Sequence, residues 1–288
     1  MPGQTGDDAP FSVEAGPPGT RFSEIRRFSR IDSTNRYLLD VARRRPQPGL
    51  VAVAEHQSAG RGRLGRTWEA PPGANLLLSV LLLPSLPMEQ LHLCNVAMSL
   101  AAADACKAAG GVDAALKWPN DLVVAGCKLA GVLAETVPAA EPAAAADGAG
   151  PVAPRAVVVG VGVNVRWPPR DDDPAWASVP VDLRVSATSL ARLTQRSVPS
   201  DELLSQLLTA LEARVGALDD AFGRVQLAQE YRARCSTIGV RVRVALADEH
   251  EVVGDALDVT PEGHLLVDVG ACITTVTAGD VVHLRGAG

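Results

Sequence analysis

The sequence predicts an α+β protein in which a region of strands and helices is followed by a small β-barrel. From residue 21 to residue 235, apolar strand patterns such as "LVAVAE" (50–55) alternate with helical patterns. From residue 236 onward the chain holds only short strand patterns separated by glycine turns, which is typical of a small barrel. With 288 residues, the chain is long enough for one large and one small domain. We therefore expect domains at 21–235 and 236–288.

The first elements are a strand, a helix and a strand pair. "RFSEIRRFSRI" (21–31) is strand-like, and "DSTNRYLLDVARRR" (32–45) is a helix that Asp32 or Ser33 can cap. Residues 50–55 and 75–83 are expected to be buried strands on either side of a glycine-rich loop. A long helix then covers 88–111, where two glycines end it.

The second half continues with strands and then two helices. Apolar runs predict strands at 114–118, 121–124, 127–137 and 156–165. The patterns at 200–222 and 225–235 predict helices, and Ser200 is the expected cap of the first. Two segments lie outside the pattern: 1–20 is expected to be a disordered tail, and the Ala/Pro-rich segment 137–155 a flexible insertion.

Composition and charge exclude several classes of function. The net charge of −6 and the pI near 5.4 argue against a general nucleic-acid or membrane-surface binder. No run approaches the ~18 apolar residues of a membrane span, and the N-terminus does not resemble a secretory signal. Five scattered cysteines without CxxC spacing fit a cytoplasmic protein with reduced thiols.

The stretch "HQSAGRGRLGRTWEAPPG" (56–73) places three arginines among three glycines. Its G-x-G-x-x-G spacing matches the dinucleotide fingerprint, but that motif requires a helix directly afterwards, and the prolines here forbid one. A Walker loop is excluded because GK[ST] is absent from the sequence. Two interpretations remain: a cationic loop that wraps a phosphate or carboxylate, or a solvated loop whose tryptophan plugs the core.

A second motif, "LKWPNDLVVAGCKLAGVLAE" (116–135), gathers two lysines, an asparagine and an aspartate in one hairpin. Such a group suits an anionic ligand accompanied by a divalent metal, although each charge taken alone is better explained as part of a solvated strand edge.

Taken together, these motifs resemble the biotin–protein ligase family. The resemblance is carried by "STN" (33–35), "EHQSAGRGRLGRTW" (55–68), "LKWPNDL" (116–122), "KLAGVLAE" (128–135), "GVGVNV" (160–165) and "ATSL" (187–190), and it runs from about residue 22 to the end. It implies a mixed-sheet catalytic domain of the biotin/lipoate ligase type and a C-terminal SH3-like β-barrel.

The resemblance implies a two-step reaction. Biotin and ATP, with Mg²⁺, would give biotinyl-5′-AMP and pyrophosphate, and a lysine of a biotin carboxyl carrier domain of an acyl-CoA or pyruvate carboxylase would then accept the biotin. The loop at 60–68 is expected to be disordered when empty and to close over the adenylate, which shields it from water.

The resemblance also implies roles for individual residues. The expected biotin-binding residues are Ser33, Thr34, Asn35, Gln57, Gly60, Arg61, Gly62, Arg63, Lys128 and Gly131. The expected nucleotide-binding residues are Arg63, Arg66, Trp68, Lys117, Asn120 and Asn164. Lys128, Arg63 and Asp121 are the expected catalytic residues, and Asp121 either coordinates a metal or accepts the proton of the incoming lysine.

Two other functions are considered beside the biotin–protein ligase hypothesis, and the ligase function itself is expected to be restricted. A lipoate or octanoyl ligase on the same scaffold is the nearest rival, and a nucleic-acid-binding module is a rival of another class. The latter predicts clustered basic and aromatic residues, whereas aromatic residues make up 3% of the chain. About 20 residues precede the ligase-like region, so we expect a monofunctional enzyme that binds neither DNA nor membranes.

Overall fold

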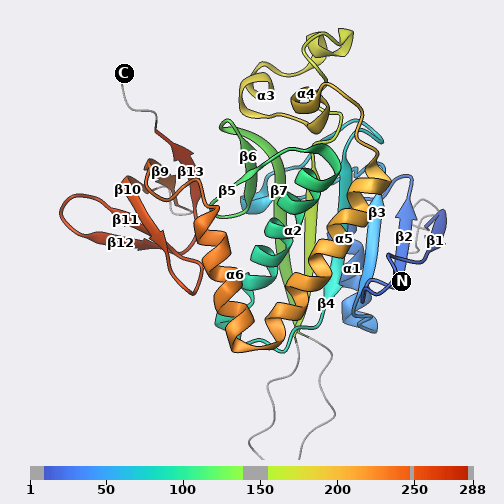
Figure 1. The fold of residues 1–288 in the computed structure, drawn as a ribbon, viewed down its shortest axis with the longest axis horizontal. Coiled ribbons are helices and arrows are strands. Elements are labelled where there is room, and N and C mark those ends of the chain that lie inside the picture. The colour runs from blue at the N-terminus through green and yellow to red at the C-terminus, as the bar shows by residue number, and fades with distance from the viewer. Residues whose placement is uncertain (1–9, 139–154, 247–249, 285–288) are drawn as a thin grey trace, which may run out of the picture.

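The computed structural model describes residues 10–138, 155–246 and 250–284. It contains an eight-stranded sheet flanked by helices and a five-stranded C-terminal sheet (Figure 1). The predicted α+β class, with a mixed sheet followed by a β module, is confirmed.

The large sheet has the order β1-β2-β3-β4-β8-β7-β6-β5. β2 and β3 are parallel and every other neighbouring pair is antiparallel, so the sheet is mixed. Its strands are β1 (Ser12–Glu14), β2 (Glu24–Phe28), β3 (Leu50–Ala54), β4 (Leu76–Leu82), β5 (Ala115–Lys117), β6 (Asp121–Val124), β7 (Cys127–Pro138) and β8 (Arg155–Val163).

Helices cover both faces of this sheet. The long helices α2 and α5 pack on one face, in front of the sheet in Figure 1, and α1 packs on the other. The helices are α1 (Thr34–Arg44), α2 (His92–Gly110), α3 (Val181–Ser186), α4 (Leu190–Thr194), α5 (Ser200–Gly216) and α6 (Ala221–Ala233). Ser33 is the N-cap of α1, as expected, because its side chain accepts a hydrogen bond from the Arg36 amide.

Alternation along the strands separates a core face from a second face. In β8 the valines at 157, 159, 161 and 163 join the core under α2 and α5, while Ala156 and Val158 pack under α1. Gly160 and Gly162 occupy the remaining positions on the α1 side. The α1 side of the sheet therefore has an apolar end, which α1 covers, and an end without bulky side chains.

The C-terminal sheet is antiparallel, with the order β12-β11-β10-β9-β13. Its strands are β9 (Arg241–Ala245), β10 (Glu251–Val259), β11 (Leu265–Asp268), β12 (Ile273–Val276) and β13 (Asp280–His283). Its buried residues, such as Val242 and Leu265, belong to the same continuous apolar core as α2, α5 and α6. The Trp118 indole N–H also donates to the Gly263 carbonyl at 2.9 Å, which ties the two parts together.

The structure differs from the predictions at three places. Residues 12–14, expected in a tail, instead form β1, because they pair with β2 and Glu14 accepts a charged hydrogen bond from Arg27; residues 1–9 lie outside the described part. Val137 and Arg155 belong to β7 and β8, whereas residues 139–154 of the predicted insertion lie outside the described residues. The expected Ser200 cap is wrong: Ser200 is the first helical residue, and Pro199 occupies the cap position without a side-chain hydrogen bond.

Candidate active site

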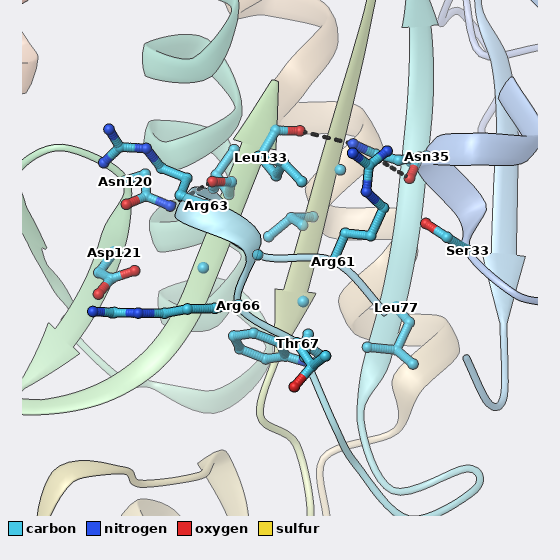
Figure 2. Close-up of a pocket in the computed structure, with 18 of the residues that line it drawn as sticks. Ser33, Asn35, Arg61, Arg63, Arg66, Thr67, Leu77, Asn120, Asp121 and Leu133 are labelled. Carbon is cyan, nitrogen blue, oxygen red and sulfur yellow. Dashed lines mark hydrogen bonds between the residues drawn. The ribbon is translucent and has the colours of Figure 1, made fainter. Parts of the chain in front are cut away.

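A cavity lies on the α1 side of the large sheet, beyond the end that α1 covers. The 56–73 loop covers it (Figure 2). The start of β7 also contributes, and so do Gly279 and Asp280, where β13 begins. Most predicted site residues line this one cavity: Ser33, Thr34, Asn35, Gln57, Arg61, Gly62, Arg63, Arg66, Trp68, Asn120, Asp121, Lys128 and Gly131.

Two facing glycines form part of the cavity floor. Gly131 of β7 lies directly opposite Gly162 of β8, and the Trp68 indole rests on both. A Cβ on Gly162 would lie 2.6 Å from Trp68 Cε2, and one on Gly131 would lie 3.1 Å from Trp68 Cζ3. Only glycine at 162 therefore leaves room for this ring. The buried indole N–H has no hydrogen-bond partner among the described residues.

One end of the cavity carries neutral hydrogen-bonding groups. The Thr34 amide and hydroxyl both donate to Gln57 Oε1, at 2.8 and 3.0 Å, and the Thr34 hydroxyl lies 2.7 Å from the Ser79 hydroxyl. Ser79 in turn donates to Asn35 Oδ1 at 2.6 Å. These side chains come from the start of α1, from β4 and from the residues after β3, and each bond fixes the orientation of its neighbour.

The loop over the cavity is a tight reversal of the chain. Arg61 and Thr67 form an isolated antiparallel bridge, and the Gly62 amide donates to the Arg66 carbonyl at 2.7 Å. Leu64 and Gly65 at its tip both have positive φ, 54° and 73°. Glycine adopts this conformation without strain, whereas Leu64 does so at a cost and exposes 55% of its surface.

The three arginines of the loop point in three directions (Figure 2). Arg61 pairs with Glu135 of β7 at 2.9 Å, and Arg66 pairs with Asp280 of β13 at 2.6 Å. Arg63 makes no ion pair with any of the described residues. Its guanidinium donates a 3.4 Å hydrogen bond to the Gly279 carbonyl. Burial lowers the pKa of the Arg63 guanidinium, which nonetheless remains cationic.

The KWPND hairpin supplies a second cation and a carboxylate. Lys128 Nζ lies 2.6 Å from Asp121 Oδ1 and 5.4 Å from the centroid of the Trp68 ring. Asn120 is held to β7, because it exchanges two hydrogen bonds with the Val132 backbone. Lys128, Asp121 and Arg63 therefore lie around one part of the cavity, where two anions could be brought together.

Three of the predicted site residues do not line the cavity. Gly60 lies beneath the loop, where a Cβ would lie 2.3 Å from the Trp68 carbonyl oxygen. Asn164 is buried, and its amide donates to the carbonyls of Lys128 and Thr188 while it accepts from Asn75. Lys117 stands outside the cavity at the end of β5. Gly60 and Asn164 thus support the loop and the Lys128 strand.

Sequence reasoning missed Ser79, Glu135 and Asp280. The first two had a signal: positions 131, 133 and 135 of β7 share a face, and so do 77 and 79 of β4. Asp280 had none, since it reaches the site through the packing of the C-terminal sheet.

Comparison with known proteins identifies the family. Residues 27–150 match the biotin/lipoate A/B protein ligase family, and residues 237–284 match the biotin protein ligase C-terminal domain. The chain is 41% identical to the biotin–[acetyl-CoA-carboxylase] ligase of Mycobacterium tuberculosis, over 82% of this chain and 80% of that protein. This chain belongs to the biotin protein ligase family. Its resemblance to that family is thereby confirmed.

Other proteins of this family are also similar to the chain in sequence or in fold. The bifunctional ligase/repressor BirA of Bacillus subtilis is 26% identical over 87% of this chain and 71% of that protein. The biotin protein ligase of Aquifex aeolicus, solved in complex with biotin and ATP, shares the fold with a TM-score of 0.69 at 22% identity, over 91% of this chain and 99% of that one.

The described residues contain neither a candidate metal cluster nor a candidate membrane span. No group of three or more His, Cys, Asp or Glu side chains there could hold a metal ion. No helix in the same residues is long and apolar enough to cross a membrane.

Proposed function

We propose that this chain is an ATP-dependent biotin protein ligase. It joins biotin to the α-phosphate of ATP, which releases pyrophosphate and gives biotinyl-5′-AMP, and then transfers biotin to a lysine of a carrier domain. Beyond family membership, one observation carries the proposal. A single cavity combines a neutral hydrogen-bonding end with a cationic region, as a ligand with a ureido ring and a carboxylate requires.

We assign the neutral end to the ureido ring of biotin. Ser33, Thr34 and Gln57 offer donors and acceptors for its N–H and carbonyl groups, and Leu77 and Leu133 supply apolar surface for the rest of the molecule. This arrangement also favours biotin over lipoate, whose dithiolane ring cannot match those polar groups.

Lys128 and Arg63 are the proposed catalytic cations. The carboxylate of biotin and the α-phosphate repel each other as they approach, and each charge-assisted hydrogen bond to them is worth about 1.5–3 kcal/mol. Lys128 would exchange its Asp121 partner for these anions. Arg63 makes no ion pair among the described residues, so it can meet them without losing one.

We propose Trp68, Arg66 and Asn120 for the nucleotide. The Trp68 ring can flank the adenine, and Arg66 can contact phosphate when it leaves Asp280. Mg²⁺ is expected to arrive with ATP, and it binds carboxylates together with phosphates. Asp121 fits, since its buried Oδ1 atom pairs with Lys128 and accepts no other hydrogen bond from the described residues. Bound there, the ion would neutralise the departing pyrophosphate.

The proposed acceptor is the biotin carboxyl carrier domain of an acyl-CoA carboxylase. The relatives from M. tuberculosis and Paracoccus denitrificans are named for acetyl-CoA carboxylase, which supports this class. Because ATP and such a carboxylase are found in the cytoplasm, we place the reaction there. Asp121 is also positioned to accept a proton from the incoming lysine, since it lies in the same part of the cavity as Lys128.

The test is transfer of labelled biotin to a purified carrier domain. Label should appear on the carrier only with ATP, and a carrier whose acceptor lysine is replaced by arginine should stay unlabelled. Lipoate offered in place of biotin should give little product. Absence of transfer, or equal transfer of lipoate, would contradict the proposal.

A further inference from the structure

We infer that Glu135 is a positioning residue for biotin binding, because it links the side chain that closes the polar end of the cavity to the loop that covers it. The inference rests on the proposed function. Glu135 does not itself line the cavity, so it acts through Asn35 and Arg61.

The first link is to Asn35. The Asn35 amide nitrogen donates to Glu135 Oε2 at 2.9 Å. It also donates to the Leu133 carbonyl at 3.2 Å (Figure 2). Its oxygen accepts from Ser79, as described above, and a Cβ on Gly160 would lie 2.1 Å from this oxygen. Asn35 is therefore seated on a glycine and bonded on both sides, so that its orientation depends on Glu135.

The second link is to the loop. Glu135 Oε1 lies 2.9 Å from Arg61 Nη1, so the two side chains form an ion pair. Glu135 has a side chain that is 21% exposed, compared with 48% for Arg61. The carboxylate on β7 is thus the more buried partner, and the arginine on the loop is the more exposed one. Figure 2 shows Arg61 running from the loop toward Asn35, at the end of the cavity away from Asp121.

The consequence is preorganisation. One carboxylate holds both Asn35 and the Arg61 end of the loop in place before biotin binds. Less conformational entropy of these groups is therefore lost on binding. Since Arg61 is neutralised by Glu135, its charge is not the one that meets the reacting anions. The pair should therefore affect the affinity for biotin and leave the chemical step unchanged.

The test is the Glu135→Gln variant, which keeps the shape and removes the charge. The KM for biotin should rise about five- to tenfold, the cost of replacing a partly exposed charged bond by a neutral one. The kcat of adenylate formation and the KM for ATP should stay within about twofold. Trypsin, which cleaves after arginine, should cut the 61–66 loop of the ligand-free variant faster than that of the wild type.

A double-mutant cycle separates positioning from a general loss of structure. Arg61→Gln should raise the KM for biotin by a similar factor, and the double variant should be no worse than either single one. Additive effects would show that the pair does not act as a unit. The Glu135→Asp variant keeps the charge on a shorter side chain. Its KM for biotin should therefore rise less than that of Glu135→Gln.

Glu212→Gln is the matched control. Glu212 of α5 pairs with Arg21, has a similarly half-buried side chain at 27% exposure and does not line the cavity. Its removal should change neither the KM nor the loop cleavage. If wild type fails to label the carrier domain, the proposed function is wrong. If wild type labels it and Glu135→Gln leaves the KM for biotin unchanged, or lowers kcat alone, the inference about Glu135 is wrong.

Discussion

Replacing Lys128 by alanine should slow adenylate formation by ~100-fold or more while the fold survives. Lys128 Nζ lies 2.6 Å from Asp121 Oδ1, so its loss leaves a bare carboxylate where biotin and the α-phosphate must meet. Two unit charges 4 Å apart interact by about 4 kcal/mol at an effective dielectric constant near 20. The Lys128 side chain is 38% exposed, and water therefore screens part of this energy. The expected loss of about 3 kcal/mol corresponds to the ~100-fold effect.

The assay is pyrophosphate release in a single turnover, without the carrier domain, so that only the first step is measured. Stability should fall by less than about 1 kcal/mol, as for other partly exposed ion pairs. Lys107→Ala is the control, because Lys107 forms an exposed ion pair with Asp113 away from the site. Adenylate formation by Lys128→Ala within a few fold of the wild-type rate would remove Lys128 from the mechanism.

Three other perturbations have defined outcomes. Arg63→Ala should raise the KM for biotin and speed escape of the adenylate, measured as free adenylate after one turnover; unchanged escape would count against a role in retention. Gly162→Ala places a methyl group 2.6 Å from the Trp68 ring, so the ring must move, and the indole fluorescence and the KM for ATP should both change. Hydrogen bonds from Arg214 and Arg234 outweigh burial and hold the pKa of Asp104 below its ordinary value. Their contribution to stability should thus be present at pH 7 and be lost as the pH falls below about 4, and Asp104→Asn should flatten that decline in urea unfolding.

Much of the fold could be predicted because its signals are local. The strand at 156–165 is a run of valines and small residues, and the helix from residue 34 has its cap and its apolar side within a few residues of each other. β1 could not be predicted in this way, because three residues form a strand only when a neighbouring edge accepts them. Ser200 is a good capping residue, but the extended backbone of Pro199 takes the cap position one residue earlier.

In the site, too, the features that are local in sequence could be predicted and the long-range contacts could not. The GRGRLGR loop and the KWPND hairpin are contiguous in sequence, and their residues line one cavity. What the sequence does not display is which charges neutralise one another. Arg61 and Arg66 find their carboxylates 74 and 214 residues away, in Glu135 and Asp280. Only the tertiary arrangement shows Arg63 to be the arginine of the loop without an ion pair among the described residues.

The apolar interior shared by the C-terminal sheet and the helices α2, α5 and α6 has a consequence for how the molecule comes apart. Two regions with separate cores can unfold one after the other, whereas two regions that share a core unfold together. Heating should accordingly produce one calorimetric peak, and a chain shortened before residue 236 should lose the whole assembly, not merely its last fifty residues.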